Sequence, residues 1–391
     1  MREGWRTQRL GELCDIVKGR KPKLKAQASE GDLPYLVAKV MRGTQEPEFA
    51  ALSDRNSIPV SEDETIIICD GSNSGEVFTG FRGVLSSTMG KLVKKGDIDD
   101  AYLRAFLDST FEVFNGAKTG AAIPHLDKEA LYALPFSYPA LSEQRRIVAI
   151  LDEAFESIVT AKANAEKNLQ NARELFTHHR EALLAAQPCW RESPLAELCA
   201  IKHGYAFEGE FFSATGEHVL LTPGSFFEAG GYRERGEKTK YFVGPIPKDY
   251  VLSEGDLLVA MTEQAAGLLG SPLLVPESRR FLHNQRLGLV VGLAGVPWSN
   301  EFFFHVFNLI RVRQEIHASA SGAKVRHTSP AKIGLVRVAY PDSVDEQRSI
   351  AEQLVELSKE CDRLVDVYER KLVALDDLKK SLLHQAFSGQ L

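Results

Sequence analysis

A chain of 391 residues with 44% hydrophobic and 26% charged residues has the composition of a soluble globular protein and is long enough for two or three domains. No apolar stretch approaches the roughly 20 residues that span a bilayer, and the opening MREGWRTQRL lacks the apolar segment of a secretory signal. We therefore expect a cytoplasmic protein. The net charge of −6 argues against a protein that coats nucleic acid through bulk charge, although local basic patches can still bind it.

The chain contains one sequence unit twice. The segment WRTQRLGELC, which starts at Trp5, recurs as WRESPLAELC from Trp190. Further on, TGAAIPH at 119–125 matches SGAKVRH at 321–327, and each is followed by a Tyr-Pro pair and a helix start, SEQRR or DEQRS. Ends that match and middles that differ predict a common frame that carries two distinct sites.

The middles, at 20–118 and 205–320, share little beyond strand-like runs such as 64–70 and 255–262. Frequent Gly, Pro, Asn and Ser between these runs indicate a β-rich α/β module with long loops. Short helices are expected near 102–115 and 302–317.

A long helix closes each unit. In the second, apolar residues alternate by steps of 4 and 3 from Ile350 to Leu382, which is typical of a coiled-coil seam. The predicted positions are Ile350, Leu354, Leu357, Cys361, Leu364, Tyr368, Lys371, Leu375, Leu378 and Leu382, with Lys371 as the exception. The first helix has a looser seam, which ends in Asn168, Ala172 and Leu175. It also has a second apolar stripe that could bury against another protein: Val148, Phe155, Leu169, Phe176 and Leu183.

These features predict an α+β fold with two β-rich α/β domains in a tandem pseudo-twofold repeat. Two long helices separate the domains and form an antiparallel coiled coil. The expected boundaries are 1–140 for the first domain, 141–187 for the first helix, 188–342 for the second domain and 343–391 for the second helix. The helix pair is either a structural hairpin that buries apolar area or a ruler that fixes the distance between two recognition surfaces.

The first candidate site is a basic cluster after the first strand. Five cations in eight residues suit contact with phosphates, although a solvated surface loop explains them equally well. The members are Lys18, Arg20, Lys21, Lys23 and Lys25. At the matching place the second copy has Lys202, His203 and Tyr205 instead. Different side chains at one structural position are what two unequal DNA half-sites require.

Polar loops after the predicted strands supply candidate base readers, because Asn and Gln pair with adenine, Glu accepts from cytosine and Arg reads guanine. Turn-forming loops are the alternative for each residue. The candidates are Ser72, Asn73, Ser74, Glu263, Gln264, Asn284, Gln285 and Arg286. The two closing segments add possible phosphate contacts through Lys118, His125, Lys324, Arg326 and His327, although their recurrence is also explained by a turn that needs glycine.

Catalytic motifs are absent from the sequence. There is no G-x-x-x-x-G-K-[ST] loop, no H-E-x-x-H, no G-x-S-x-G and no Asn/Asp-Pro-Pro-aromatic tetrapeptide of a DNA methyltransferase. The five cysteines are scattered and form no C-x-x-C pair, so no zinc site or disulfide framework is expected. We expect a non-catalytic protein without a metal or cofactor of its own.

Together the repeated W-x-x-x-x-L-x-E-L-C opening, the [TS]-G-A-x-x-x-H segment, the Tyr-Pro and E-Q-R helix starts and the ending LKKSLLHQAFSGQL resemble the specificity (S) subunit of Type I restriction-modification systems. The resemblance implies that each variable target-recognition domain reads half of an asymmetric, bipartite site in double-stranded DNA. It also implies that the helices space the domains and bind two modification subunits, which use S-adenosylmethionine. Restriction subunits that use ATP and Mg²⁺ would join that core.

The alternative to DNA recognition is a non-enzymatic coiled-coil scaffold or adaptor whose two modules bind proteins. The tandem frame and the long helices fit it equally well. Binding to duplex DNA that weakens with salt would discriminate the two functions. An undetected nuclease would instead require metal-dependent cleavage by the chain alone.

Overall fold

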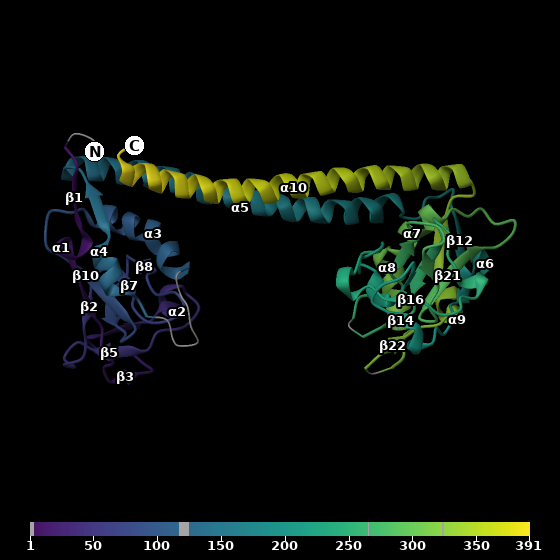
Figure 1. The fold of residues 1–391 in the computed structure, drawn as a ribbon, viewed down its shortest axis with the longest axis horizontal. Helices are drawn as coiled ribbons and strands as arrows, with labels where there is room; N and C mark the ends of the chain where they lie inside the picture. Colours follow the sequence, from purple (N-terminus) through teal and green to yellow (C-terminus); the bar gives the residue numbers. More distant parts are fainter. Residues whose placement is uncertain (1–3, 117–124, 265, 323) are drawn as a thin grey trace. The chain divides into compact units, whose positions relative to one another are not determined.

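The computed structural model describes residues 4–116, 125–264, 266–322 and 324–391. Contacts divide the chain into two compact units, of which unit 1 comprises Met1–Glu166 with Glu369–Leu391 and unit 2 comprises Lys167–Tyr368. The α+β class expected from the sequence is confirmed, because each unit combines mainly antiparallel sheets with packed helices (Figure 1). Each of the two long helices contributes one part of its length to unit 1 and the other to unit 2.

The repeated ends of the sequence form the frame of unit 1. Strand β1 (Arg6–Arg9) pairs antiparallel with β11 (Pro135–Tyr138), and helix α1 (Leu10–Leu13) contacts α4 (Lys128–Ala133). Beside them lies a sheet in the order β2-β10-β7-β8, which Figure 1 shows with α3 alongside. The elements of this sheet are β2 (Cys14–Lys18), β10 (Met89–Lys94), β7 (Ile66–Ile68), β8 (Val77–Phe78) and the covering helix α3 (Asp100–Gly116).

The variable middle of unit 1 forms a second sheet in the order β3-β5-β4-β9-β6. Its strands are short and joined by polar loops, as the Gly, Pro and Ser punctuation predicted. The elements are β3 (Leu24–Lys25), β4 (Asp32–Leu36), α2 (Ala38–Met41), β5 (Phe49–Ala51), β6 (Pro59–Val60) and β9 (Gly83–Leu85).

Unit 2 repeats the frame. Strands β12 (Arg191–Pro194) and β23 (Arg337–Tyr340) pair antiparallel, and α6 (Leu195–Leu198) contacts α9 (Pro330–Gly334). The sheet order β13-β21-β17-β19 matches that of unit 1. Its strands and flanking helices are β13 (Cys199–His203), β21 (Leu287–Gly292), β17 (Leu257–Ala260), β19 (Pro272–Leu274), α7 (Asn300–Phe307) and α8 (Ile310–Ala318).

The variable middle of unit 2 forms a further sheet in the order β14-β16-β15-β20 and a ribbon of β18 with β22. The strands are β14 (Phe212–Ser213), β15 (His218–Leu220), β16 (Tyr241–Phe242), β18 (Thr262–Glu263), β20 (Phe281–Leu282) and β22 (Arg326–His327). Single 3-10 turns lie at Gly209–Phe211, Pro223–Ser225, Gly236–Lys238 and Lys248–Tyr250.

A glycine in the same place allows the first two strands of each sheet to pack closely. A Cβ at Gly90 would lie 2.5 Å from Cγ2 of Ile16, and a Cβ at Gly288 would lie 2.5 Å from Cγ2 of Ile201. The two units therefore share side-chain packing as well as strand order.

The long helices are α5 (Leu141–Leu183) and α10 (Val344–Ser388). In unit 1 the start of α5 packs on the end of α10, where Ile147 and Leu151 share a cluster with Leu383 and Ala386. In unit 2 the end of α5 and the start of α10 join another cluster. The helices are thus antiparallel, as expected, and Figure 1 shows them side by side.

The phase of the predicted seam is wrong along part of α10. Ile350, Leu354 and Cys361 are buried, but Leu364 and Leu378 are 40% and 47% exposed. The neighbours Val365 and Leu372 are partly buried instead. Where two apolar residues stand side by side, periodicity alone does not decide which one faces the partner helix.

The predicted seam of α5 is wrong at two positions, since Asn168 and Leu175 are exposed. The predicted Ala172 is buried, and so is Leu169, the neighbour of Asn168. The second apolar stripe of α5 was expected to be free to contact another protein, but it packs within this chain. Its members Val148 and Phe155 pack against the core of unit 1, and Phe176 and Leu183 pack against that of unit 2. Leu169, the remaining member, is buried as well.

Candidate nucleic-acid interface

In unit 1 the fold brings three predicted segments together at Asp70, just beyond the end of β7. The carboxylate of Asp70 binds Lys18 Nζ at 2.6 Å and His125 Nδ1 at 2.8 Å. The backbone of the closing segment is bridged to Asp70, and the Leu126 N–H donates to the Cys69 carbonyl at 2.8 Å. The basic cluster, the polar loop and the closing segment therefore form one surface.

Hydrogen bonds hold the Asp70 carboxylate in its charged form. Partial burial raises the pKa of Asp70, but hydrogen bonds from Lys18 and His125 outweigh it and leave this pKa below its ordinary value. At neutral pH the carboxylate therefore keeps Lys18 and His125 in place beside the loop.

Unit 2 has the same backbone arrangement with different side chains. Thr262 follows β17 as Asp70 follows β7, and it pairs with His327 of the second closing segment. The Thr328 N–H donates to the Met261 carbonyl at 3.0 Å, which matches the Leu126–Cys69 bond of unit 1. The recurrence of TGAAIPH as SGAKVRH thus reflects a shared β-pairing that keeps a histidine in both units, and the residue opposite it is Asp70 in one and Thr262 in the other.

The rest of the basic cluster in unit 1 is only partly neutralised. Lys25 Nζ binds the Asp32 carboxylate at 2.8 Å, whereas the side chains of Arg20 and Lys21 are exposed and have no hydrogen bond or ion pair with another described residue. The Lys23 backbone N–H donates to Asp54 at 2.9 Å.

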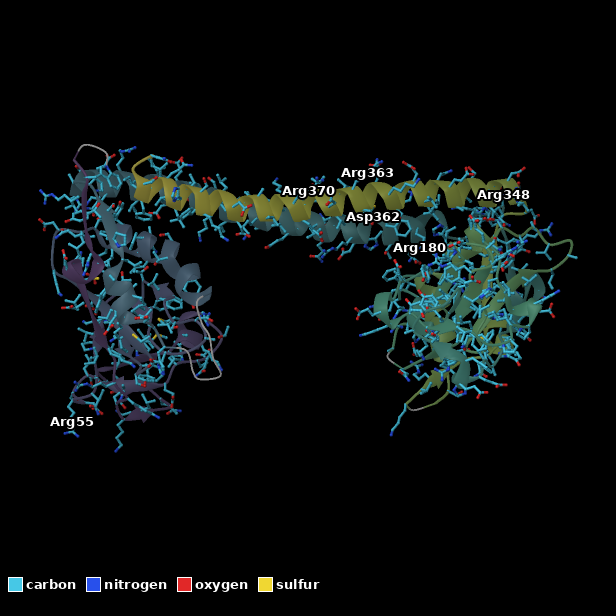
Figure 2. The ribbon with its side chains drawn as sticks, viewed as in Figure 1. Arg55, Arg180, Arg348, Asp362, Arg363 and Arg370 are labelled. Atoms are coloured by element: carbon cyan, nitrogen blue, oxygen red, sulfur yellow. The ribbon has the colours of Figure 1, made fainter. Side chains whose placement is uncertain are left out.

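That last contact adds a cation that sequence reasoning missed. Asp54 precedes Arg55, whose exposed side chain points outward from unit 1 near β3 and β5 (Figure 2). A single arginine in a polar loop carries no sequence signal, because only the β3-β5 pairing brings it next to the cluster.

The residues of the polar loop in unit 1 differ in how exposed their side chains are. Ser72 is exposed, whereas Asn73 donates to Glu76 at 3.2 Å and Ser74 is only 1% exposed. The predicted base-reading role of Ser74 is therefore wrong, because a buried hydroxyl cannot reach a base edge.

In unit 2 two predicted groups lie together. Tyr205 pairs with Asn284 through a parallel bridge, and the Gln285 N–H donates to the Tyr205 carbonyl at 2.9 Å. The Asn284 side chain accepts from the Arg286 N–H at 3.0 Å, which is a turn contact. Gln285 and Arg286 are exposed, as are Lys202 and His203 on the strand that leads to Tyr205.

The structure corrects the expectation for Glu263. Its side chain is 1% exposed, and its carboxylate accepts from the backbone N–H groups of Gly267, Leu268 and Leu269 at 2.9–3.1 Å and from Arg326 Nη1 at 3.2 Å. Arg326 also donates to the His317 carbonyl at 2.7 Å. Glu263 and Arg326 therefore hold the β18–β22 ribbon together inside the fold.

The remaining candidates are at the surface or outside the description. Gln264, Lys324 and His327 are exposed, and Lys118 lies outside the described residues. Within the described ranges no group of three or more His, Cys, Asp and Glu side chains is placed to hold a metal, and no helix is long and apolar enough to cross a membrane.

Comparison with known proteins shows which proteins the chain is similar to. Residues 2–169 match the family of the Type I restriction modification DNA specificity domain. The whole chain is 24% identical to the Type I restriction enzyme MjaVIII specificity subunit of Methanocaldococcus jannaschii and covers 93% of it. The chain is also 24% identical to the Type I restriction enzyme EcoBI specificity subunit of Escherichia coli, over an alignment that covers 56% of this chain and 43% of that subunit.

Solved structures show the same fold over the full chain. A chain from a study of complex assembly and conformational transition of the type I R-M system aligns with a TM-score of 0.72 at 16% identity, covering 100% of this chain and 99% of that one. The HsdS subunit from Thermoanaerobacter tengcongensis aligns with a TM-score of 0.65 at 16% identity, covering 100% and 98%. The resemblance found in the sequence motifs is confirmed.

Proposed function

We infer that this chain, a specificity subunit of the Type I restriction-modification kind, reads one asymmetric DNA target in two halves, one with each unit. The observation that carries this inference is the shared frame with unlike side chains. Lys18 and Asp70 occupy positions that correspond to His203 and Thr262, whereas the histidine is kept in both units as His125 and His327. Two identical readers would favour a palindrome, whereas unlike readers on one frame suit an asymmetric site.

The side chains divide into two chemical roles. Exposed cations such as Lys21 and Arg55 suit phosphates, which supply affinity without sequence information. Gln285 and Arg286 in unit 2 are exposed and carry groups that pair with base edges. Because both units are in one chain, the binding of the second half-site is intramolecular, and modest half-site affinities multiply.

The long helices would space the two recognition domains and dock two modification subunits. Exposed apolar side chains on α10 support such docking, since Val355, Val367 and Val373 are 46%, 48% and 62% exposed. In this proposal S-adenosylmethionine chemistry, and the ATP and Mg²⁺ of restriction subunits, belong to the partners. The chain itself supplies recognition and no catalysis.

The test is base-resolution adenine methylation of host DNA, with this gene intact and with it deleted. We expect a split, asymmetric motif that loses methylation in the deletion strain. Replacing residues 20–118 with those of a related subunit should change one half of that motif and leave the other half unchanged.

Unchanged methylation while the modification partners are expressed would contradict the proposal. The adaptor alternative would then be judged by duplex-DNA binding of the assembled complex at two salt concentrations. A DNA reader that neutralises several phosphates loses affinity steeply with salt, whereas an adaptor shows no such binding.

A further inference from the structure

Unit 2 contains a cavity of about 390 Å³ between the end of α5, helix α8 and the loops that contain Glu228 and Gly267. It is distinct from the recognition surface described above. Arg180 of α5 and Arg313 of α8 line it, together with Glu228, Asn308 and His317. Figure 2 labels Arg180 where α5 meets the rest of unit 2.

Both arginines that line this cavity have buried donors without a partner among the described residues. Arg180 is 6% exposed, its Nε has no hydrogen-bond partner among the described residues, and its nearest ion pair, with Glu181, is long at 3.6 Å. Arg313 donates from Nη2 to the Gly267 carbonyl, but its Nε and Nη1 have no partner within the same described set. Leaving such buried donors unpaired is costly, so a ligand that accepts from them is favoured.

The two guanidinium groups also repel each other. Burial lowers the pKa of Arg313 to about 10, Arg180 pushes it in the same direction, and the attraction of Glu263 and Glu228 opposes the change. Burial likewise lowers the pKa of Arg180. Both side chains remain charged at neutral pH, and an anion between them would relieve the repulsion.

The nearby carboxylates leave donors of these arginines unpaired, because Glu263 and Glu181 already accept hydrogen bonds from other groups. Glu263 accepts from three backbone N–H groups and from Arg326, and Glu181 accepts from the Ile310 N–H at 3.0 Å. Glu228 lines the cavity and makes no hydrogen bond to either arginine. It would disfavour an incoming anion.

We propose that this cavity binds a phosphate group, held between Arg180 and Arg313. Arginine forks match the oxygens of phosphate, and charged hydrogen bonds of this kind are strong. The volume lies at the lower end of small-molecule sites, so it admits a free phosphate ion or a small phosphate monoester. The bound group would join the spacer helix α5 to α8 of the second recognition domain.

The experiment is isothermal titration of the full-length chain, without DNA, with inorganic phosphate and in parallel with adenosine monophosphate at constant ionic strength. We expect saturable binding of at least one of them, and the comparison shows whether the ion or the ester is preferred. The variants R180Q and R313Q should each weaken binding at least tenfold. The matched control R311Q changes an exposed arginine of α8 that pairs with Glu315, and it should bind as the wild-type chain does.

A gain-of-affinity variant guards against effects of misfolding. E228Q removes the carboxylate that opposes an anion and leaves both arginines in place, so it should bind the same probe several-fold more tightly. Absence of saturable binding to the wild-type chain, or equal binding by R180Q, R313Q and R311Q, would overturn the proposal. Because the titration contains no DNA, its outcome is separate from that of the methylation test.

Discussion

At the residue scale, one buried glutamine secures the start of each long helix. Gln144 donates to the Pro139 carbonyl at 2.9 Å and accepts from the Asp99 N–H at 2.9 Å. Gln347 does the same with the Pro341 carbonyl at 3.0 Å and the Ser299 N–H at 2.8 Å. Both side chains are fully buried. The repeated Tyr-Pro and E-Q-R motif is therefore explained as a joint between strand and helix.

Replacing Gln347 with leucine should lower the free energy of unfolding of unit 2 by about 3 kcal/mol, because buried groups lose their partners. Urea unfolding followed by fluorescence of Trp190 and Trp298, which both pack in this unit, measures the change. The control is Gln353→Leu on the exposed face of the same helix. Equal midpoints for the two variants would show that the joint is not needed for stability.

A buried histidine should make unit 2 sensitive to acid. Burial lowers the pKa of His305 to about 4 from its ordinary value of 6.5, and Arg180 adds to the shift. The unfolded chain binds this proton below pH 6.5 but the folded chain does not until about pH 4. Stability is therefore full above pH 6.5 and is lost as the pH falls through this window.

The expected loss from His305 is about 3 kcal/mol between pH 6.5 and pH 4, from 1.36 kcal/mol per pKa unit. Urea unfolding at a series of pH values measures it, and His305→Leu should reduce the slope of the profile in this window. Exposed His178 on α5 supplies the control, since His178→Ala should keep the slope. A wild-type profile as flat as that of His305→Leu would refute the assignment.

At the element scale, small residues allow α5 and α10 to approach closely. Ala165 is fully buried, whereas Ala163, two residues earlier on α5, is exposed. Near this point Lys162 of α5 binds Asp376 of α10 at 2.8 Å, which shows that the helices are adjacent here. A seam with small residues on one helix leaves little room for larger side chains.

Ala165→Leu should therefore cost about 1–3 kcal/mol through overpacking. The thermal midpoint of the helical circular dichroism signal is the measurement. Ala163→Leu adds the same atoms on the exposed face and should leave the midpoint nearly unchanged. If both variants have the same thermal midpoint, the seam accommodates a larger side chain at position 165.

At the scale of the whole molecule, the helices should set the spacing between the two half-sites. Seven residues inserted into both α5, after Glu166, and α10, after Tyr368, keep the period of the seam and lengthen each helix by about 10 Å. At 3.4 Å per base pair this corresponds to about three base pairs.

Methylation mapping with the lengthened chain should show both half-sites unchanged and the unspecified spacer longer by about three base pairs. Insertion of four residues in each helix breaks the register and should abolish methylation. A spacer of unchanged length in the seven-residue variant would show that the helices do not set the distance between the half-sites.

The repeated frame could be predicted from the sequence because it depends on local signals that occur twice. The opening segment, with Cys14 and Cys199 each bonded to the carbonyl four residues earlier, forms the same turn in both units. The heptad period likewise predicted two long helices, since a repeated apolar stripe must be buried. Their antiparallel orientation was predicted from the tandem repeat of the units.

Tertiary structure alone decided which polar residues face outward. In the sequence Glu263 and Gln264 are equal candidates for base contact. In the structure Glu263 is buried and accepts hydrogen bonds from three backbone N–H groups, whereas Gln264 is exposed. Periodicity also could not choose between Leu364 and Val365 in the seam. Pairing partners far away in the chain make these choices, because a buried carboxylate or an apolar side chain takes the position in which its neighbours best satisfy it.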